Sequence, residues 1–166
     1  MHRKMLVVLA VAGCVHAAGD AALDRETLRG ITAVNVVIDR LDPVLEREGL
    51  NVSTLQDRIE QRLQRAGIHM DQNAKEFVGL RITQVRDRRG PYAVCIMIGV
   101  YQPVELTRDR KLHTATQTWE VESVLMADPK QLNQATQDTL DDLAGRFVTA
   151  FQSVNPATAS SSGRGN

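Results

Sequence analysis

Residues 76–102 read EFVGLRITQVRDRRGPYAVCIMIGVYQ, and this stretch decides the fold. Apolar residues alternate with small or polar ones over residues 76–85, which predicts a half-buried strand. Residues 92–102 are apolar at both odd and even positions, so both faces of the predicted strand are apolar, which predicts a strand that is more deeply placed in the fold. The run RDRRGP between them ends in Gly90-Pro91 and is typical of a turn. The stretch therefore predicts two antiparallel strands joined by a hairpin.

Helix signals lie on either side of this hairpin. Residues Ser53–Gly67 carry apolar side chains at helical spacing, with Ser53 as the expected N-cap, Gln56 completing a capping box and Gly67 as the C-cap. Asp128-Pro129 is typical of a helix start, and apolar residues keep helical spacing from there to Val154. Two helices are therefore expected.

Two further strands complete the expected sheet. Residues 30–41 are rich in valine and isoleucine and end at Asp42-Pro43, and residues 44–52 are expected to be a loop. A turn at residues 107–111 (TRDRK) precedes an alternating strand at residues 113–126, whose buried side is expected to comprise Ala115, Trp119, Val121 and Leu125. The order β-α-β-β-β-α predicts an α+β fold, a two-layer sandwich of a four-stranded mixed sheet with two helices on one face. The pattern leaves the strand order open.

The N-terminus resembles a secretory signal peptide. A positively charged start precedes an apolar run that is too short to span a membrane, and small residues follow. Cleavage would remove residues 1–17 and leave residues 18–29 as an N-terminal linker. Alternatively, residues 11–14 (VAGC) resemble a bacterial lipobox, in which Cys14 carries the lipid. The sequence predicts an exported protein, either periplasmic or anchored as a lipoprotein, and membrane contact is expected only if Cys14 is lipidated.

The rest of the chain is expected to form a single domain over residues 30–154, followed by a polar, disordered tail at residues 155–166. The full chain carries 20 basic and 20 acidic side chains, and loss of residues 1–17 leaves 18 basic against 20 acidic. This balance argues against a nucleic-acid partner. Two similar basic runs, VRDRRG (residues 85–90) and TRDRK, are expected at opposite ends of the sheet. We interpret them as solvated turns.

No catalytic, metal or cofactor site is predicted. His69 and His113 lack the paired ligand spacing of a zinc site. Glu120 and Glu122 share one strand face, as an acid–base pair would, but the threonine-rich surroundings favour a solvent-exposed side of a sheet. The chain contains no phosphate loop, dinucleotide fingerprint or nucleophile elbow.

The candidate binding site is the second face of the strand at residues 92–102. Ala93, Cys95, Met97 and Tyr101 make it unusually apolar for a face opposite the helices, and Phe77 and Val85 extend it. Cys95 has no partner for an intramolecular disulfide, and we interpret it as a small apolar residue rather than a reactive thiol. Two interpretations stay open: a face covered by loops or by the N-terminal segment, and a surface for an envelope partner or for self-association.

The exported β-α-β-β-β-α plan resembles small envelope modules of Gram-negative bacteria. It is similar to the N-terminal domain of TolB and to globular domains of envelope lipoproteins that bind or activate partner proteins. It also resembles small, uncharacterised exported proteins with the opening LRGITAVNVVIDRLDP, here Leu28–Pro43, and with the pair Thr118-Trp119. The resemblance implies a non-catalytic interaction module of the cell envelope and transfers no catalytic or ligand residue. The alternatives are an accessory periplasmic hydrolase or other enzyme, and an outer-membrane lipoprotein that binds lipid or a polyanion.

Overall fold

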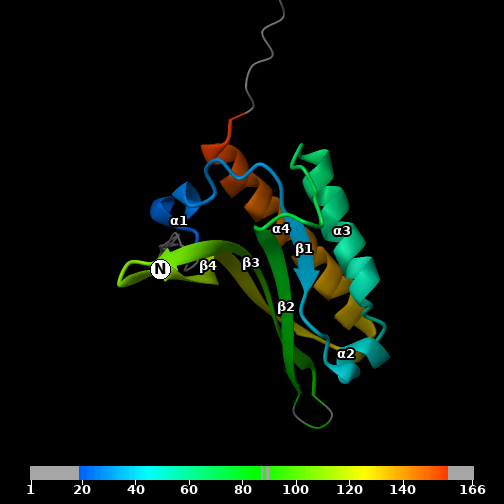
Figure 1. The fold of residues 1–166 in the computed structure, drawn as a ribbon. Helices are drawn as coiled ribbons and strands as arrows, with labels where there is room; N and C mark the ends of the chain where they lie inside the picture. The colour runs from blue at the N-terminus through cyan, green and yellow to red at the C-terminus, as the bar shows by residue number, and fades with distance from the viewer. Residues whose placement is uncertain (1–18, 87, 89, 157–166) are drawn as a thin grey trace, which may run out of the picture.

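The computed structural model describes residues 19–86, 88 and 90–156. Within these residues the chain forms four strands and four helices (Figure 1). The strands are β1 (Asn35–Ile38), β2 (Phe77–Arg86), β3 (Tyr92–Leu106) and β4 (Asp109–Ala127), and the helices are α1 (Ala22–Glu26), α2 (Pro43–Arg47), α3 (Val52–Arg65) and α4 (Pro129–Val154). The expected signal peptide, the lipobox at Cys14 and residues 157–166 of the expected tail lie outside the described residues.

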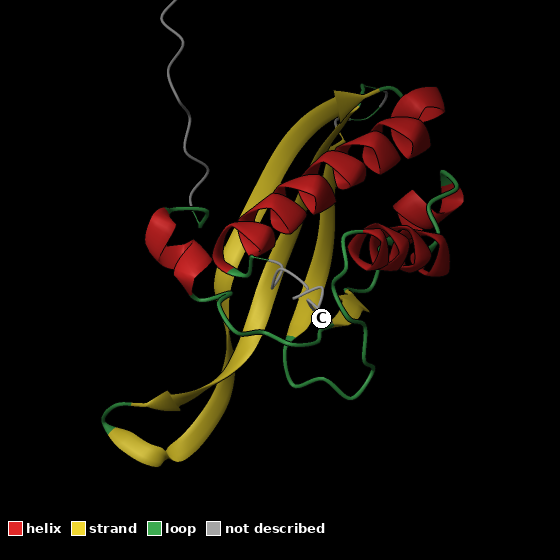
Figure 2. Cartoon of the chain, turned by 90° about the horizontal axis from the view of Figure 1, so that it is seen from above, coloured by secondary structure: helices red, strands yellow, loops and turns green. Residues whose placement is uncertain are grey.

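The predicted α+β class is confirmed. The sheet is mixed, with strand order β1-β2-β3-β4, in which β1 runs parallel to β2 and the other neighbours are antiparallel. Helices α3 and α4 cover the same face of the sheet (Figures 1 and 2). The two turns of the β2–β3–β4 meander lie at opposite ends of β3, whose 15 residues span about 50 Å. The two basic runs therefore do not form one patch.

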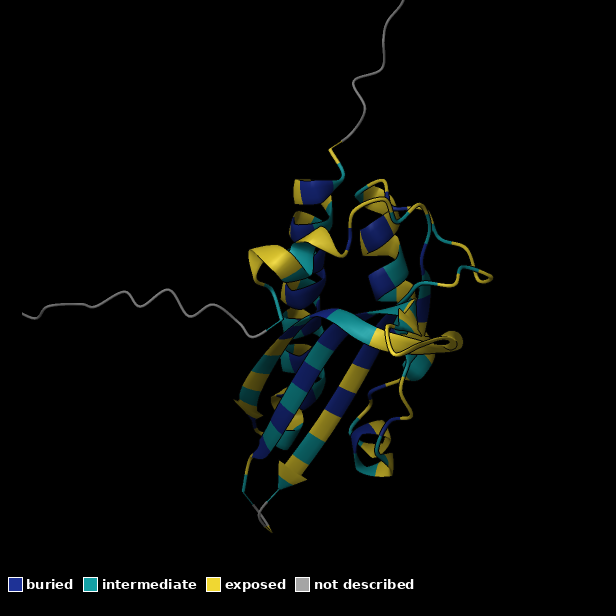
Figure 3. Cartoon of the chain, turned by 60° about the vertical axis from the view of Figure 1, so that its left-hand side comes forward, coloured by how far each residue is buried: buried dark blue, intermediate teal, exposed yellow. Residues whose placement is uncertain are grey.

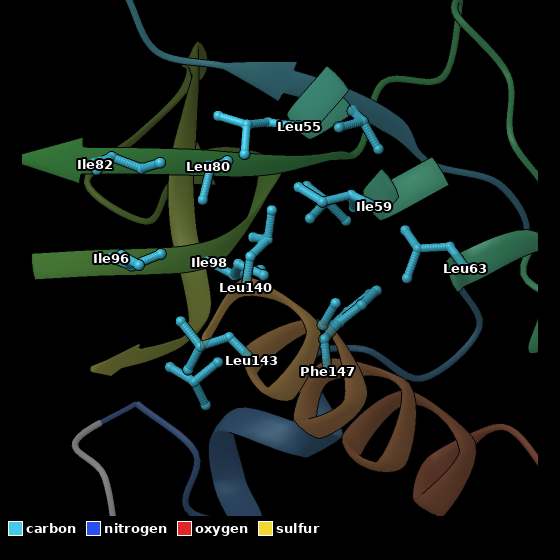
Figure 4. Close-up of a cluster of buried hydrophobic side chains, with 14 of the residues drawn as sticks. Leu55, Ile59, Leu63, Leu80, Ile82, Ile96, Ile98, Leu140, Leu143 and Phe147 are labelled. Carbon is cyan, nitrogen blue, oxygen red and sulfur yellow. The ribbon is translucent and has the colours of Figure 1, made fainter. Parts of the chain in front are cut away.

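Apolar side chains from the covered face and the two helices form the core (Figure 4). The sheet contributes alternate residues of β2 and β3 and the β4 residues Trp119 and Val121. Helix α3 contributes Leu55, Ile59 and Leu63, and α4 contributes Leu132, Leu140, Leu143 and Phe147, all of them at most 1 % exposed. These are the positions that helical spacing predicted, so the periodicity of both long helices is confirmed.

The start of α3 differs from the prediction. Asn51, and not Ser53, is the N-cap, because its Oδ1 accepts hydrogen bonds from the backbone N–H groups of Ser53 at 2.9 Å and Thr54 at 3.3 Å. The Ser53 hydroxyl donates to the same Oδ1, so it supports the cap instead of forming it. At the other end, Gly67 has φ +80°, as expected for a glycine that follows a helix.

A short helix, α2, occupies the segment expected to be a loop. Asp42 Oδ1 accepts a hydrogen bond from Val44 N at 2.7 Å and Pro43 takes the first helical position. The Asp-Pro pair that was interpreted as the end of a strand is therefore also the start of a helix. Strand β1 is correspondingly short, ending at Ile38 instead of at residue 41.

The domain extends beyond the expected bounds at residues 30–154. Residues 18–29, expected to be a linker, contain α1 and Leu28, whose side chain is fully buried. Asn155, expected in the tail, ties this segment to the end of α4. Its Oδ1 accepts from Gly30 N at 2.8 Å, and its Nδ2 donates to the carbonyl oxygens of Leu28 at 2.9 Å and Phe151 at 3.1 Å.

Strands β3 and β4 are longer than predicted and continue past β2 as a two-stranded arm (Figure 2). Strand β2 pairs with β3 only as far as Tyr101, so residues 102–106 pair with β4 alone. Pro103 lies inside this arm, where β3 has a free edge, so its missing N–H is tolerated. The turn is confined to Thr107-Arg108, so the rest of the expected TRDRK turn belongs to β4.

A bulge at Thr118 changes the alternation of β4. Val100 pairs with Trp119, whereas Tyr101 pairs with Gln117, so Thr118 is the extra residue. Ala115 therefore lies on the opposite side of β4 from Trp119, and its expected place on the buried side was wrong. It is exposed, like the other β4 residues of the arm. Val121 is buried and Leu125 half-buried, as expected from the part of the strand beyond the bulge.

Candidate functional site

The face of the sheet that points away from α3 and α4 is the candidate site, and we call it the outer face. The strand register fixes its members because neighbouring residues on β2, β3 and β4 form rows across the sheet. Figure 3 shows the alternation of buried and less buried residues along these strands. The outer face comprises Asn35, Val37, Phe77, Gly79, Arg81, Thr83, Val85, Ala93, Cys95, Met97, Gly99, Tyr101, Gln117, Glu120, Glu122, Val124 and Met126.

One end of the outer face is apolar and open to solvent. Val85, Val124 and Met126 are 73 %, 68 % and 64 % exposed. They surround the half-buried Ala93 and Cys95 of β3, since Ala93 pairs with Val85 on one side and Met126 on the other, and Cys95 pairs with Val124. We call these five residues the apolar end. The large exposed fractions show that no segment of the described chain covers the apolar end.

A charged row lies next to the apolar end. Met97 pairs with Arg81 of β2 and with Glu122 of β4. Arg81 Nε donates to Asp39 Oδ2 at 2.7 Å, and this hydrogen bond and the charge of Asp39 raise the pKa of the guanidinium. Both side chains of the Arg81–Asp39 pair are about half exposed. The row therefore presents a cation and an anion on opposite sides of β3.

Cys95 is held as a neutral thiol. Its Sγ lies 3.9 Å from Glu122 Oε2, to which the thiol can donate. Burial and, secondarily, the negative charge of Glu122 raise the pKa of the Cys95 thiol. Since the thiolate is the reactive form, this environment makes Cys95 a poor nucleophile.

Beyond the charged row, aromatic side chains border a small hollow. The Phe77 and Tyr101 rings stack with centroids 4.8 Å apart and planes within 5°. Gly79 makes room for them, because a Cβ there would lie 2.8 Å from Tyr101 Cε2. The hollow has a volume of about 220 Å³ and includes Val37 and Met97 in its lining. Small-molecule sites usually occupy about 300–1,000 Å³, so this hollow suits one side chain rather than a metabolite.

The structure divides the four predicted site residues between two neighbouring parts of one face. Ala93 and Cys95 belong to the apolar end, whereas Met97 and Tyr101 line the hollow. Sequence reasoning missed Val124 and Met126. The sequence contains a pattern that could have identified them, because Val124 and Met126 continue the alternation of Glu120 and Glu122 on the same side of the strand. The polar residues at the start of the strand instead favoured the prediction of a solvent-exposed side.

The residues considered for catalysis do not converge. Glu120 and Glu122 share the outer face, as predicted, but His113 pairs with Glu105 on the arm. Glu120 lines a hollow of only about 160 Å³, together with Gly19, Asp24 and Gln117. Within the described residues, no group of three or more His, Cys, Asp or Glu side chains is placed to hold a metal ion.

The N-terminal segment is attached to the free edge of β4. Glu120 N donates to Gly19 O at 3.1 Å, and Trp119 Nε1 donates to Asp20 Oδ1 at 2.9 Å. Arg25 Nε and Nη2 donate to the two oxygens of Asp20 at 2.8 and 2.9 Å. This contact covers part of the long β4 edge, and residues 19–26 leave the apolar end of the outer face exposed. No helix in the described part of the chain is long and apolar enough to cross a membrane.

Comparison with known proteins gives a single kind of match. No family model matches the chain, and no curated protein matches it. Among solved structures, the chain is similar to a minor lipoprotein from Acinetobacter baumannii, determined at 2.35 Å, with 12 % sequence identity and a TM-score of 0.32. The match covers 75 % of this chain and 92 % of that chain. This is a weak likeness of fold, and the resemblance to TolB stays a prediction.

Proposed function

We propose that this chain is a non-catalytic interaction module of the bacterial cell envelope, which binds a partner protein through the outer face of its sheet. The observation that carries the proposal is the apolar end, where Val85 of β2 and Val124 and Met126 of β4 are each more than half exposed and lie on either side of Ala93 and Cys95 of β3. Clustered apolar side chains of this kind commonly mark interaction surfaces on soluble proteins.

The form of the surface favours a protein over a small molecule. The apolar end is a sheet surface that offers contact area rather than enclosure. The adjacent hollow of about 220 Å³ is smaller than a usual small-molecule site, and apolar and aromatic side chains line it together with the Arg81–Asp39 pair. An apolar side chain of a partner that entered it would contact Phe77, Tyr101 and Met97. Aromatic residues and methionine are enriched in the contact regions of protein interfaces.

The charged row supports the same interpretation. Arg81 and Glu122 border the apolar end on β2 and β4, and Arg81 keeps its place through Asp39. Polar groups around an apolar centre are the usual anatomy of an interface, in which they set orientation and selectivity. Cys95 contributes volume here, since its pKa is raised and its thiol stays protonated.

The location in the envelope rests on the sequence. The charged start, the short apolar run and the small residues that follow are typical of an exported protein. We propose a periplasmic location, or a membrane-anchored one if Cys14 is lipidated. Mass spectrometry of the mature N-terminus decides between them: a chain that begins at Ala18 without modification excludes the lipoprotein, and a lipid-modified Cys14 excludes the free form.

In-cell photo-crosslinking tests the binding surface. A photo-reactive amino acid at Val124 or Met126 should give a crosslink to protein in living cells, and the crosslink at Met126 should disappear when Val85→Asp is introduced beside it. Leu112 is the matched control, because it is 50 % exposed but lies on the arm. Crosslinks at Val124 and Met126 that are no stronger than at Leu112 would contradict the proposal.

A further inference from the structure

We infer that the protein bound by the outer face is a second copy of this chain, in a face-to-face dimer whose two-fold axis runs along β3. The inference rests on the proposed use of the outer face and names its partner. In a two-fold interface the same patch occurs on both copies, so the patch must be complementary to itself. The three rows of the outer face that pass through Ala93, Cys95 and Met97 meet this requirement for one direction of the axis.

The symmetry follows from the strand order. Strand β3 lies between β2 and β4, and each outer-face residue of β3 has one neighbour on either side. An axis along β3, in the plane between two facing sheets, places the β2 side of one copy opposite the β4 side of the other. Each β2 residue of a row then meets the β4 residue of the same row in the second copy.

The rows of the apolar end match under this operation. Val85 meets Met126 of the second copy, and Thr83 meets Val124. Along the axis Cys95 meets its own counterpart, and so does Met97. Val124 and Met126, now largely exposed, would be covered by apolar or methyl-bearing groups. Methionine adapts its shape to the gap between packed surfaces, which suits its place at the axis and the rim.

The charged row also matches, and it selects the axis. Arg81 of each copy meets Glu122 of the other, which gives two symmetry-related ion pairs. Arg81 uses Nε for Asp39, and within the described residues neither of its Nη groups has a hydrogen-bond partner, so both can serve a second carboxylate. An axis across the strands through Met97 would instead place Arg81 against Arg81 and Glu122 against Glu122. The charges therefore favour the axis along β3.

The available area is sufficient for a concentration-dependent dimer. Strands β2, β3 and β4 are paired over ten residues, from Phe77 to Arg86 on β2. Ten residues at about 3.3 Å and three strands at about 4.8 Å give a flat footprint of roughly 480 Å² per copy. Two copies would bury about 1,000 Å² in total, without the additional area that protruding side chains contribute, which is near the lower bound of specific interfaces.

Sedimentation velocity of the purified chain over a wide concentration range tests the dimer. Arg81→Glu and Glu122→Arg should each raise the dimer dissociation constant by about tenfold or more, because each places like charges together at both symmetry-related contacts. The double variant R81E/E122R should restore an affinity close to that of the unmodified chain. Arg29→Glu is the matched control, because the Arg29–Glu26 pair is exposed to a similar degree but lies off the face, and it should leave the constant unchanged.

A second pair of variants does not depend on the charge variants folding well. In the same sedimentation experiment, Val124→Asp should raise the dimer dissociation constant by about tenfold or more, because it buries a carboxylate without a partner in the apolar contact. Leu112→Asp, on the arm, should leave the constant unchanged. Since Val124 is 68 % exposed, its replacement leaves the core intact.

The outcomes separate this inference from the proposed function. A chain that sediments as a monomer at every concentration overturns the dimer, and if crosslinks from Val124 in cells then identify a different protein, the interaction module stands. A dimer that R81E does not weaken, or that the double variant does not restore, also overturns the inferred axis. If neither a dimer nor a captured protein depends on the outer face, both proposals fail.

Discussion

Removal of the Asp20 carboxylate should detach the N-terminal segment from the edge of β4. Asp20 accepts a hydrogen bond from the Trp119 indole at 2.9 Å and forms a two-point ion pair with Arg25. Its side chain is 12 % exposed, whereas that of Arg25 is 39 % exposed. The Asp20 carboxylate therefore joins α1 to the sheet through two contacts, one to the buried Trp119 indole and one to the partly exposed Arg25 guanidinium.

The expected cost of Asp20→Ala follows from those burials. Trp119 is 1 % exposed, so its indole N–H would lose its partner without gaining water, at a cost of about 1–3 kcal/mol. The ion pair with Arg25 is half open to solvent and contributes about 0.2–1 kcal/mol. We expect the free energy of unfolding to fall by about 2–3 kcal/mol, which corresponds to a decrease in Tm of roughly 6–12 °C for a domain of this size.

Urea denaturation at neutral pH measures this loss. Asp20→Asn is the informative companion, because its carbonyl can still accept from Trp119 while the charge opposite Arg25 is gone, and we expect it to cost only about 1 kcal/mol. In a cycle with Trp119→Phe, the two changes should be strongly non-additive. A loss below about 0.5 kcal/mol for Asp20→Ala, or additive effects in the cycle, would show that this contact does not hold the segment.

The same carboxylate should give an acid-dependent loss of stability. Burial alone would raise the pKa of Asp20, but the hydrogen bonds from Arg25 and Trp119, together with the charge of Arg25, outweigh it and hold the pKa below its ordinary value of 3.8. A depressed pKa in the folded state contributes stability that is fully present above the unfolded-state value. That contribution is lost as the pH falls through the folded-state value. Stability should therefore fall less steeply below about pH 4 in Asp20→Asn than in the unmodified chain.

Three further changes have defined expectations. Thr136 is fully buried on α4 and its hydroxyl has no hydrogen-bond partner among the described residues, so Thr136→Val should raise the free energy of unfolding by about 1 kcal/mol in urea; a loss of stability would mean that the hydroxyl is satisfied. Gly67 has φ +80° and open space around it, so Gly67→Ala should cost about 1–2 kcal/mol through backbone strain alone, and Gly67→Asn should cost less. Asn155→Ala removes two hydrogen bonds that join the end of α4 to Leu28 and Gly30 and a third to Phe151 within α4, and we expect a cost of about 1–3 kcal/mol and faster amide exchange at Gly30; unchanged exchange would show that Asn155 does not hold the segment in place.

The elements with strong periodicity were predictable from the sequence. Strand β2 alternates cleanly, and α4 repeats apolar residues at helical spacing for its full length, so both could be assigned to within a few residues. These patterns exist because one side of each element is buried continuously. The mixed sheet followed from the order of the elements, since a helix between β1 and β2 permits a parallel pair whereas short turns impose antiparallel ones.

The features that sequence reasoning missed depend on single contacts. Asn51 and Ser53 are both good capping residues, and only the observed bonds show that Asn51 takes the cap. The bulge at Thr118 adds one residue without any glycine or proline to mark it, so strict alternation misplaced Ala115. The bond between Asp20 and Trp119 joins residues far apart in the chain, and no local pattern encodes such a pairing.

The candidate site was predictable in its centre and not in its extent. Alternation along β3 identified Ala93, Cys95, Met97 and Tyr101, because a strand with two apolar faces stands out in any sequence. The register of β4 adds Val124 and Met126, and these are the side chains that make the surface exposed as well as apolar.

Within the described residues, the exposure of the apolar end argues against one form of the first interpretation, a face covered by loops of the domain. If the face were simply the second side of a buried strand, segments of the domain would cover it and its apolar residues would be as inaccessible as Ile96 or Ile98. Val85 and Val124 instead keep most of their surface in water, at a cost of about 25 cal/mol for each Å² of apolar area left uncovered. Polar residues at these positions would remove that cost without disturbing the core, since the side chains point away from it. The proposed use of the face in contact with another protein would account for the apolar residues, and the Arg81 and Glu122 variants test whether that protein is a second copy.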